Sequence, residues 1–201
     1  MTIAVHASEQ QWKELESSIV TFNCLRINAS NFTALPTADA YFLLQDFTGF
    51  PFNDINKPIL VHSVVPTLQE IHPSKNILRI NGWSGFLAGA VWEIAGTITP
   101  EVNAILQSMH KTPIAVPDEP GFINARVISM IINEAYFALG ENVSSKQEID
   151  TALKLGTNYP FGPFEWCAKI GIHQIYQLLN ILKTTDPRYQ PAPLLIAEAQ
   201  L

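Results

Sequence analysis

Short apolar runs separated by polar turn residues form the pattern of the first half of the chain. Each run is four or five residues long, and its mostly apolar character is typical of strands that are covered on both faces of a sheet, which favours a parallel arrangement. Ser8 followed by Gln11 has the spacing of a capping box for a helix over residues 9–17, and Pro100 begins a second helix that runs to Met109. Strands that alternate with helices predict an α/β layer structure. The expected strands are residues 2–5, 24–27, 40–44, 58–61, 77–80, 90–94 and 113–116.

The strand pattern stops near Pro117, and the second half has the apolar spacing of helices. The tail over residues 191–195 carries two prolines and is expected to be extended. The sequence therefore predicts two domains, a Rossmann-like α/β domain over residues 1–116 and an all-α domain over residues 117–201. The expected helices are residues 121–139 ended by Gly140, 146–155 capped by Ser145 and closed by Gly156, 164–169 opened by Pro163, and 172–183.

Composition and charge exclude several classes of protein. The chain is 47% hydrophobic and 15% charged, as in ordinary globular proteins. A net charge of −6 and the lack of a basic run argue against a nucleic-acid partner. Residues 77–100 are apolar but are interrupted by four glycines, so no membrane span is expected. The first residues also lack the pattern of a signal peptide.

The cysteines and histidines suggest no metal or disulfide. Cys24 and Cys167 are isolated from each other and from any C-x-x-C spacing, so two buried thiols in a reducing compartment are expected. The five histidines have no metal-ligand spacing, and no metal site is predicted. These features favour a cytoplasmic location.

Several short blocks follow one another in the second half. Each can be explained structurally, because its prolines and glycines set turns and helix starts. Taken in order, the blocks resemble the helical C-terminal domain of the 3-hydroxyacyl-CoA dehydrogenase family. That resemblance implies an acyl-CoA ligand and a two-fold homodimer formed through the helical domain. The blocks are Lys111-Thr112-Pro113, Pro120-Gly121-Phe122, Asn133-Glu134-Ala135, Tyr159-Pro160-x-Gly162-Pro163-Phe164-Glu165 and Asp186-Pro187-Arg188-Tyr189.

The cofactor fingerprint of that family is missing from the first half. The family opens with a strand followed by G-x-G-x-x-G, whose glycines let the backbone approach the pyrophosphate of NAD. Here the first strand is followed by His6 and the residues up to Gln11, and no glycine precedes Gly49. NAD is therefore implied by the resemblance alone, and no cofactor-binding residue is predicted.

The family's catalytic pair is also altered. In the family a histidine removes the proton of the 3-hydroxyl group, and a glutamate twelve residues later orients it. Aligning Val91-Trp92-Glu93-Ile94 with the family's L-V-E-V places Glu93 on the glutamate and Asn81 on the histidine. An amide cannot accept a proton near neutral pH, and losing a general base costs about 10²–10⁴ in rate.

Two further family positions differ. Ser63 is the hydroxyl nearest to the family's serine, which follows the fourth strand. Ala125 stands where the family has asparagine, although Asn124 lies one place earlier and Arg126 is kept.

Three hypotheses follow. The first is a degenerate homologue without normal NAD-dependent turnover that retains acyl-CoA or partner binding. The second is an active NAD-dependent dehydrogenase in which His62, at the end of a strand, replaces the missing base. The third is a non-catalytic dimeric interaction protein.

Overall fold

The computed structural model describes residues 1–28, 32, 35–47, 49–72 and 74–201. They form two compact units, Met1–Glu119 and Pro120–Leu201, whereas the sequence placed the domain boundary at residue 116. The first unit is built on a mostly parallel sheet and the second is helical, so the predicted fold class is confirmed.

All seven expected strands are present in one sheet, in the order β2-β1-β3-β4-β5-β6-β7. Strands β1 to β5 are parallel to one another, but β6 is antiparallel to β5, and β7 follows the direction of β6. The expectation of a parallel sheet was therefore wrong for the last two strands. The strands are β1 (Thr2–His6), β2 (Asn23–Arg26), β3 (Ala40–Leu43), β4 (Ile59–His62), β5 (Ile77–Ile80), β6 (Val91–Ala95) and β7 (Thr112–Val116).

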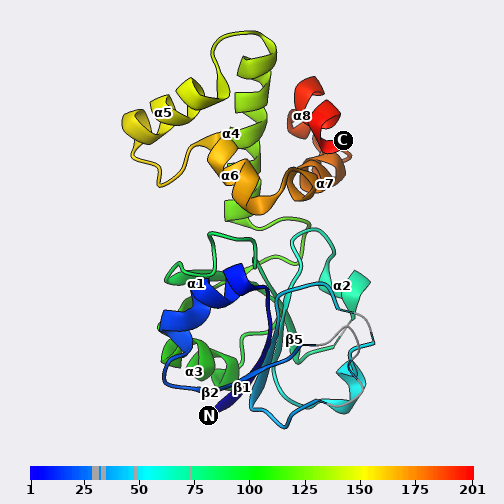
Figure 1. Ribbon diagram of the computed structural model, residues 1–201. Coiled ribbons are helices and arrows are strands. Elements are labelled where there is room, and N and C mark those ends of the chain that lie inside the picture. The colour runs from blue at the N-terminus through cyan, green and yellow to red at the C-terminus, as the bar shows by residue number, and fades with distance from the viewer. Residues whose placement is uncertain (29–31, 33–34, 48, 73) are drawn as a thin grey trace. The chain divides into compact units, whose positions relative to one another are not determined.

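The two faces of the sheet are covered differently (Figure 1). Helices α1 (Glu9–Ile19) and α3 (Pro100–Ser108) pack on one face, and the capping box expected at Ser8 and Gln11 is formed. The other face carries only the short helix α2 (Leu68–Ile71) and the 3-10 turn η1 (Phe52–Asp54) among the described residues. Aromatic side chains from β3 and from the connecting segments fill that face in place of a long helix. They include Phe32, Tyr41, Phe47, Phe50 and Phe52.

The helical unit contains the predicted helices and one more. The tail expected to be extended forms α8, because Pro193 occupies the first helical position, where proline is tolerated, and Leu195 and Ala199 are buried. Two helix ends also differ from expectation. Gly140 lies inside α4, and α5 ends at Asn158 in the left-handed region instead of at Gly156. The helices are α4 (Ile123–Gly140), α5 (Lys146–Thr157), α6 (Pro163–Ile170), α7 (Ile172–Leu182) and α8 (Pro193–Ala199), with the 3-10 turn η2 (Pro187–Tyr189) before α8.

The block around Gly162 fastens α5 to the start of α6. The Asp150 carboxylate accepts a hydrogen bond from the Phe164 amide at 2.8 Å, and Glu165 accepts one from the Gly162 amide at 3.0 Å. Lys154 in α5 pairs with Glu165. These contacts satisfy amides at a helix N-terminus that have no partner within the helix. The block therefore has a structural role.

The Asn133 block has a similar role at the other end of the unit. Its buried amide donates to the Gln190 carbonyl at 2.9 Å and accepts from the Ala192 amide at 2.8 Å. One side chain thus holds the segment before α8 against α4, and both partners are main-chain groups.

Candidate functional site

In open α/β sheets ligands bind at the carboxyl ends of the parallel strands. His62 is the last residue of β4, and Asn81 directly follows β5. The antiparallel register of β5 and β6 pairs Arg79 with Ala95 and Ile80 with Ile94. Continuing that register by one residue brings Asn81 opposite Glu93, which is 7% exposed. The two positions that the sequence compared with a catalytic pair therefore face each other at this edge.

The Asn81 side chain is held in a local turn. Its Oδ1 accepts a hydrogen bond from the Trp83 amide at 3.1 Å. Its Nδ2 is buried and has no hydrogen-bond partner among the described residues. Nδ2 only donates, and the amide oxygen does not take up a proton near neutral pH, so this position offers no general base.

His62 is neutral in this environment. Its Nδ1 accepts a hydrogen bond from the Gly82 amide at 2.9 Å, so the ring proton is on Nε2. Burial lowers the pKa of His62 to about 4, while the Ile80 carbonyl and the charge of Asp46 act in the opposite direction. A general base works best when its pKa is near the working pH. This histidine is therefore a hydrogen-bond donor more than a base.

Ser63 has a structural role at the same edge. Its buried hydroxyl donates to the Pro66 carbonyl at 2.7 Å, which closes the turn after β4. Its own carbonyl accepts from Arg79 at 3.0 Å. Ala125 and Asn124, which correspond to the family's asparagine region, belong to α4 in the other unit.

The turn between β1 and α1 does not fit the pyrophosphate of a dinucleotide. Where glycines would be needed, the Ser8 hydroxyl accepts from the Gln11 amide and the Gln11 side-chain oxygen accepts from the Ser8 amide, at 3.1 and 2.9 Å. The Gln11 side-chain nitrogen donates to the Leu44 and Gly82 carbonyls at 2.6 and 2.9 Å. The first turn of α1 is thus capped internally and joined to the segments that follow β3 and β5. No chemical step through NAD can be derived from these residues.

Sequence reasoning missed the role of Gln11. A capping box signals only a local contact, whereas its two carbonyl partners lie 33 and 71 residues away. No local pattern could have identified them.

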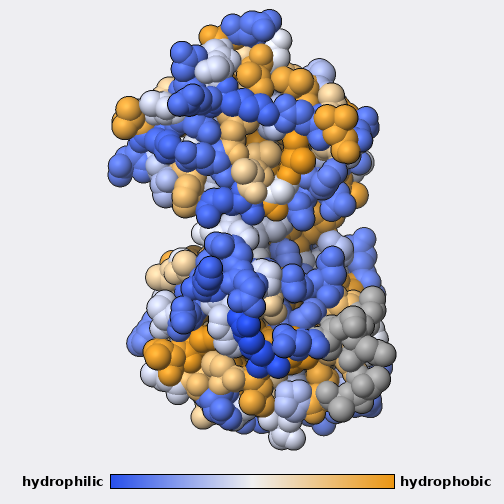
Figure 2. All heavy atoms as spheres, viewed as in Figure 1, coloured by the Kyte–Doolittle hydropathy of each residue, from blue (hydrophilic) through white to orange (hydrophobic). Residues whose placement is uncertain are grey.

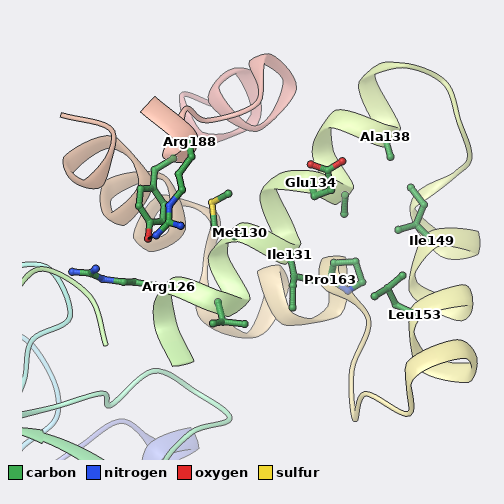
Figure 3. Close-up of a pocket in the computed structure, with 12 residues that line it drawn as sticks. Arg126, Met130, Ile131, Glu134, Ala138, Ile149, Leu153, Pro163 and Arg188 are labelled. Atoms are coloured by element: carbon green, nitrogen blue, oxygen red, sulfur yellow. Dashed lines mark hydrogen bonds between the residues drawn. The ribbon is translucent and has the colours of Figure 1, made fainter. Parts of the chain in front are cut away.

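A groove of about 690 Å³ lies in the helical unit and was also not predicted. Figure 3 shows it between α4 and α5, with Pro163 of α6 on its floor and Arg188 at one end. Exposed apolar side chains belong to or adjoin it: Val127 is 51% and Ile123 is 58% exposed. The sequence did contain a signal for this groove. The apolar residues of α4 cover more of the helix surface than one buried face needs.

Three charged side chains line the groove. Arg126 and Arg188 lie at one end, and Glu134 lies on α4 beyond Met130 (Figure 3). Arg126 donates to the Pro120 carbonyl at 2.7 Å. Arg188 pairs with Asp186 at 3.0 Å and keeps a side chain that is 67% exposed.

Within the described part of the chain, no group of three His, Cys, Asp or Glu side chains is placed to hold a metal ion. Across the same residues, no helix has the length and apolar character needed to cross a membrane. Figure 2 shows hydrophilic residues over much of the visible surface of both units, with apolar residues scattered between them.

A mostly parallel sheet followed by a separate helical unit defines a Rossmann-like protein with an added all-α domain. Residues 121–199 match the family described as 3-hydroxyacyl-CoA dehydrogenase, C-terminal domain. The helical unit therefore matches the C-terminal domain of that family, which confirms the resemblance found in the sequence for these residues.

Two curated relatives are similar in sequence to about half of this chain. The 3-hydroxyadipyl-CoA dehydrogenase of Escherichia coli is 45% identical over 123 residues, which are 57% of this chain and 26% of the relative. The 3-hydroxybutyryl-CoA dehydrogenase of Clostridioides difficile is 37% identical over 109 residues, which are 51% of this chain and 39% of the relative. The chain thus matches much less than two thirds of either relative.

Solved structures agree on the fold. The (S)-3-hydroxybutyryl-CoA dehydrogenase PaaH1 of Ralstonia eutropha superposes with a TM-score of 0.72 at 19% identity, covering 98% of this chain and 92% of that one. The 3-hydroxybutyryl-CoA dehydrogenase of Escherichia coli K12 has a TM-score of 0.60 at 36% identity, covering 73% of this chain and 32% of that one.

Proposed function

We propose that this chain is a member of the 3-hydroxyacyl-CoA dehydrogenase family and that the chain itself does not carry out NAD-dependent turnover. It acts by binding a ligand or a partner through its helical unit. The observation that carries the proposal is the Gln11 side chain, which bridges Leu44 and Gly82 where a dinucleotide would need an open glycine turn. The amide of Asn81 opposite Glu93 points the same way, because the proton acceptor is missing. The names of the relatives make a 3-hydroxyacyl-CoA the first ligand to test.

The rival function is an active dehydrogenase with His62 as the base. Two observations count against it. The nitrogen that could accept a proton already accepts a hydrogen bond from Gly82, and burial lowers the pKa of this histidine to about 4. Protonation of Nδ1 would cost that hydrogen bond.

Titration with NADH and with acetoacetyl-CoA tests the proposal. Trp83 and Trp92 are buried and lie close to Asn81 and Glu93 in the chain, so their fluorescence is the readout for ligands at the strand ends. We expect no saturable response to NADH at micromolar concentrations, because the Gln11 contacts close the turn between β1 and α1. Micromolar affinity for NADH in isothermal titration calorimetry would contradict the proposal. A response to acetoacetyl-CoA alone would assign the retained ligand, and no response to either would leave association through the helical unit.

The groove of the helical unit fits a second copy of this chain. Its apolar walls would be an unusually exposed patch on a monomer. Glu134 and Arg188 lie on opposite sides of Met130 (Figure 3), so a two-fold axis near Met130 would bring each of them toward the opposite charge of the partner. We therefore propose an isologous dimer through α4.

Charge reversal tests this dimer. Glu134→Arg and Arg188→Glu, made singly, should each place like charges across the axis and weaken association by roughly tenfold to a hundredfold. The double variant should recover most of the loss, because the opposite charges are restored in exchanged positions. Sedimentation velocity over a concentration series measures the effect, and Glu141→Arg, on an exposed residue after α4, is the matched control. If neither single variant nor the double variant changes association, the dimer interface does not include the groove.

A further inference from the structure

Arg79 is a charged residue with 0% exposure, in the middle of the sheet. Burying an ionised group is costly unless it is paired and hydrogen-bonded. Its guanidinium meets this condition with groups from two distant segments. It donates to the Ser63 and Val64 carbonyls at 3.0 and 3.2 Å, in the loop after β4. It also pairs with the Asp118 carboxylate and donates to the Glu119 carbonyl at 3.2 Å, where the first unit ends.

Asp118 joins the same two segments a second time. Both of its carboxylate oxygens accept from the Leu68 amide, at 3.0 and 2.9 Å. Leu68 is the first residue of α2, which follows the loop after β4. One ion pair therefore links the loop, the start of α2 and the last residues of the first unit.

The chain beyond this point is fixed just as closely to the helical unit. The Pro120 carbonyl accepts from Arg126 Nε and Nη2 at 3.1 and 2.7 Å. Gly121 has a φ of +79°, and a Cβ there would lie 2.9 Å from Arg126 Cγ and from Leu178 Cδ1. A residue with a Cβ would therefore be strained at this position.

We infer that Arg79 and Asp118 form a clamp that couples the loop after β4 to the connection between the two units. The neighbouring carbonyls of Glu119 and Pro120 each accept a hydrogen bond from an arginine of their own unit. A rearrangement of the loop that follows His62 shifts the groups that hold Asp118 and so reaches the last residues of the first unit. The coupling does not depend on whether the strand ends bind an acyl-CoA.

Hydrogen exchange on the full chain tests the clamp. Asp118→Asn keeps the shape of the side chain and removes its charge. Amide exchange should rise by about tenfold or more in residues 64–71 and in residues 116–121 together, because charge-assisted hydrogen bonds are lost on both sides. Exchange in α5 and α7 should stay unchanged.

Glu101→Gln is the matched control, because it removes an exposed ion pair to Lys57, which is expected to contribute little to stability, and neither peptide should respond to it. Arg79→Met should raise exchange in both peptides by more than Asp118→Asn does. If Arg79→Met does not fold, Asp118→Asn still tests the clamp. A rise confined to one of the two peptides, or no rise in either, would overturn the coupling.

Discussion

Replacing Gly162 with alanine is expected to destabilise the helical unit by about 3 kcal/mol, the upper range for overpacking a tight site. A Cβ at this position would lie 2.5 Å from the Cα of Asp150 and would overlap its side chain. Asp150 cannot move away without losing its hydrogen bond to the Phe164 amide, which caps α6. The substituted protein must therefore either keep the steric clash or leave the buried N-terminus of α6 without its cap.

Gly156→Ala is the matched control for this prediction. Gly156 lies in α5 of the same unit, and a Cβ there meets nothing within 4 Å. Alanine is the better helix former, so this variant should be more stable than the parent by about 0.5–1 kcal/mol. Urea denaturation followed by circular dichroism at 222 nm, with hydrogen exchange in α6 as a local probe, compares the two. Equal midpoints for Gly162→Ala and the parent would contradict the steric argument.

The positions of the strands could be predicted because buried runs of four or five apolar residues are a local signal. The reversed direction of β6 could not be predicted in the same way. A parallel partner needs a long crossover, usually a helix, whereas residues 81–90 form turns and return the chain in the opposite direction. Whether such a segment crosses over or turns back depends on its tertiary contacts. Lys111, for example, donates to the Leu87 and Gly89 carbonyls.

The ends of helices were the weakest part of the sequence interpretation. Gly140 and Gly156 are good helix-ending residues, yet Gly140 is itself the last residue of α4, and α5 continues one residue beyond Gly156. Asn158 ends α5 in the left-handed region, a role that asparagine also fills. Propensity therefore locates a helix end only to within one or two residues.

The candidate site was predictable in part. The resemblance paired Asn81 with Glu93 through a twelve-residue spacing, and the antiparallel register of β5 and β6, which the sequence did not predict, places these residues opposite each other. The closing of the β1–α1 turn by Gln11 depends on contacts between segments that are far apart in the chain. Absence of glycines indicated that the fingerprint was missing, but could not indicate what replaces it.

The second large effect concerns turnover. Oxidation of 3-hydroxybutyryl-CoA by the purified chain is expected to be negligible, with loss of the general base alone accounting for about 10²–10⁴ in rate. Asn81→His should restore little, because a base helps only when hydride donor and acceptor are held in line, and the Gln11 contacts oppose binding of the acceptor.

His62→Ala separates this expectation from its rival. If His62 were the base, the parent would form NADH at a measurable rate, the variant would lose that rate, and the pH profile would follow the ionisation of a histidine. The pKa of His62 is lowered to about 4, so the neutral form of the ring would already dominate at pH 6. In the rival hypothesis, activity would therefore fall only below about pH 4. We expect flat traces for the parent, Asn81→His and His62→Ala when NADH formation is followed spectrophotometrically from pH 5 to 9. Robust turnover by the parent would overturn the proposed function, since the contacts of Gln11 and the amide of Asn81 would then have to open during catalysis.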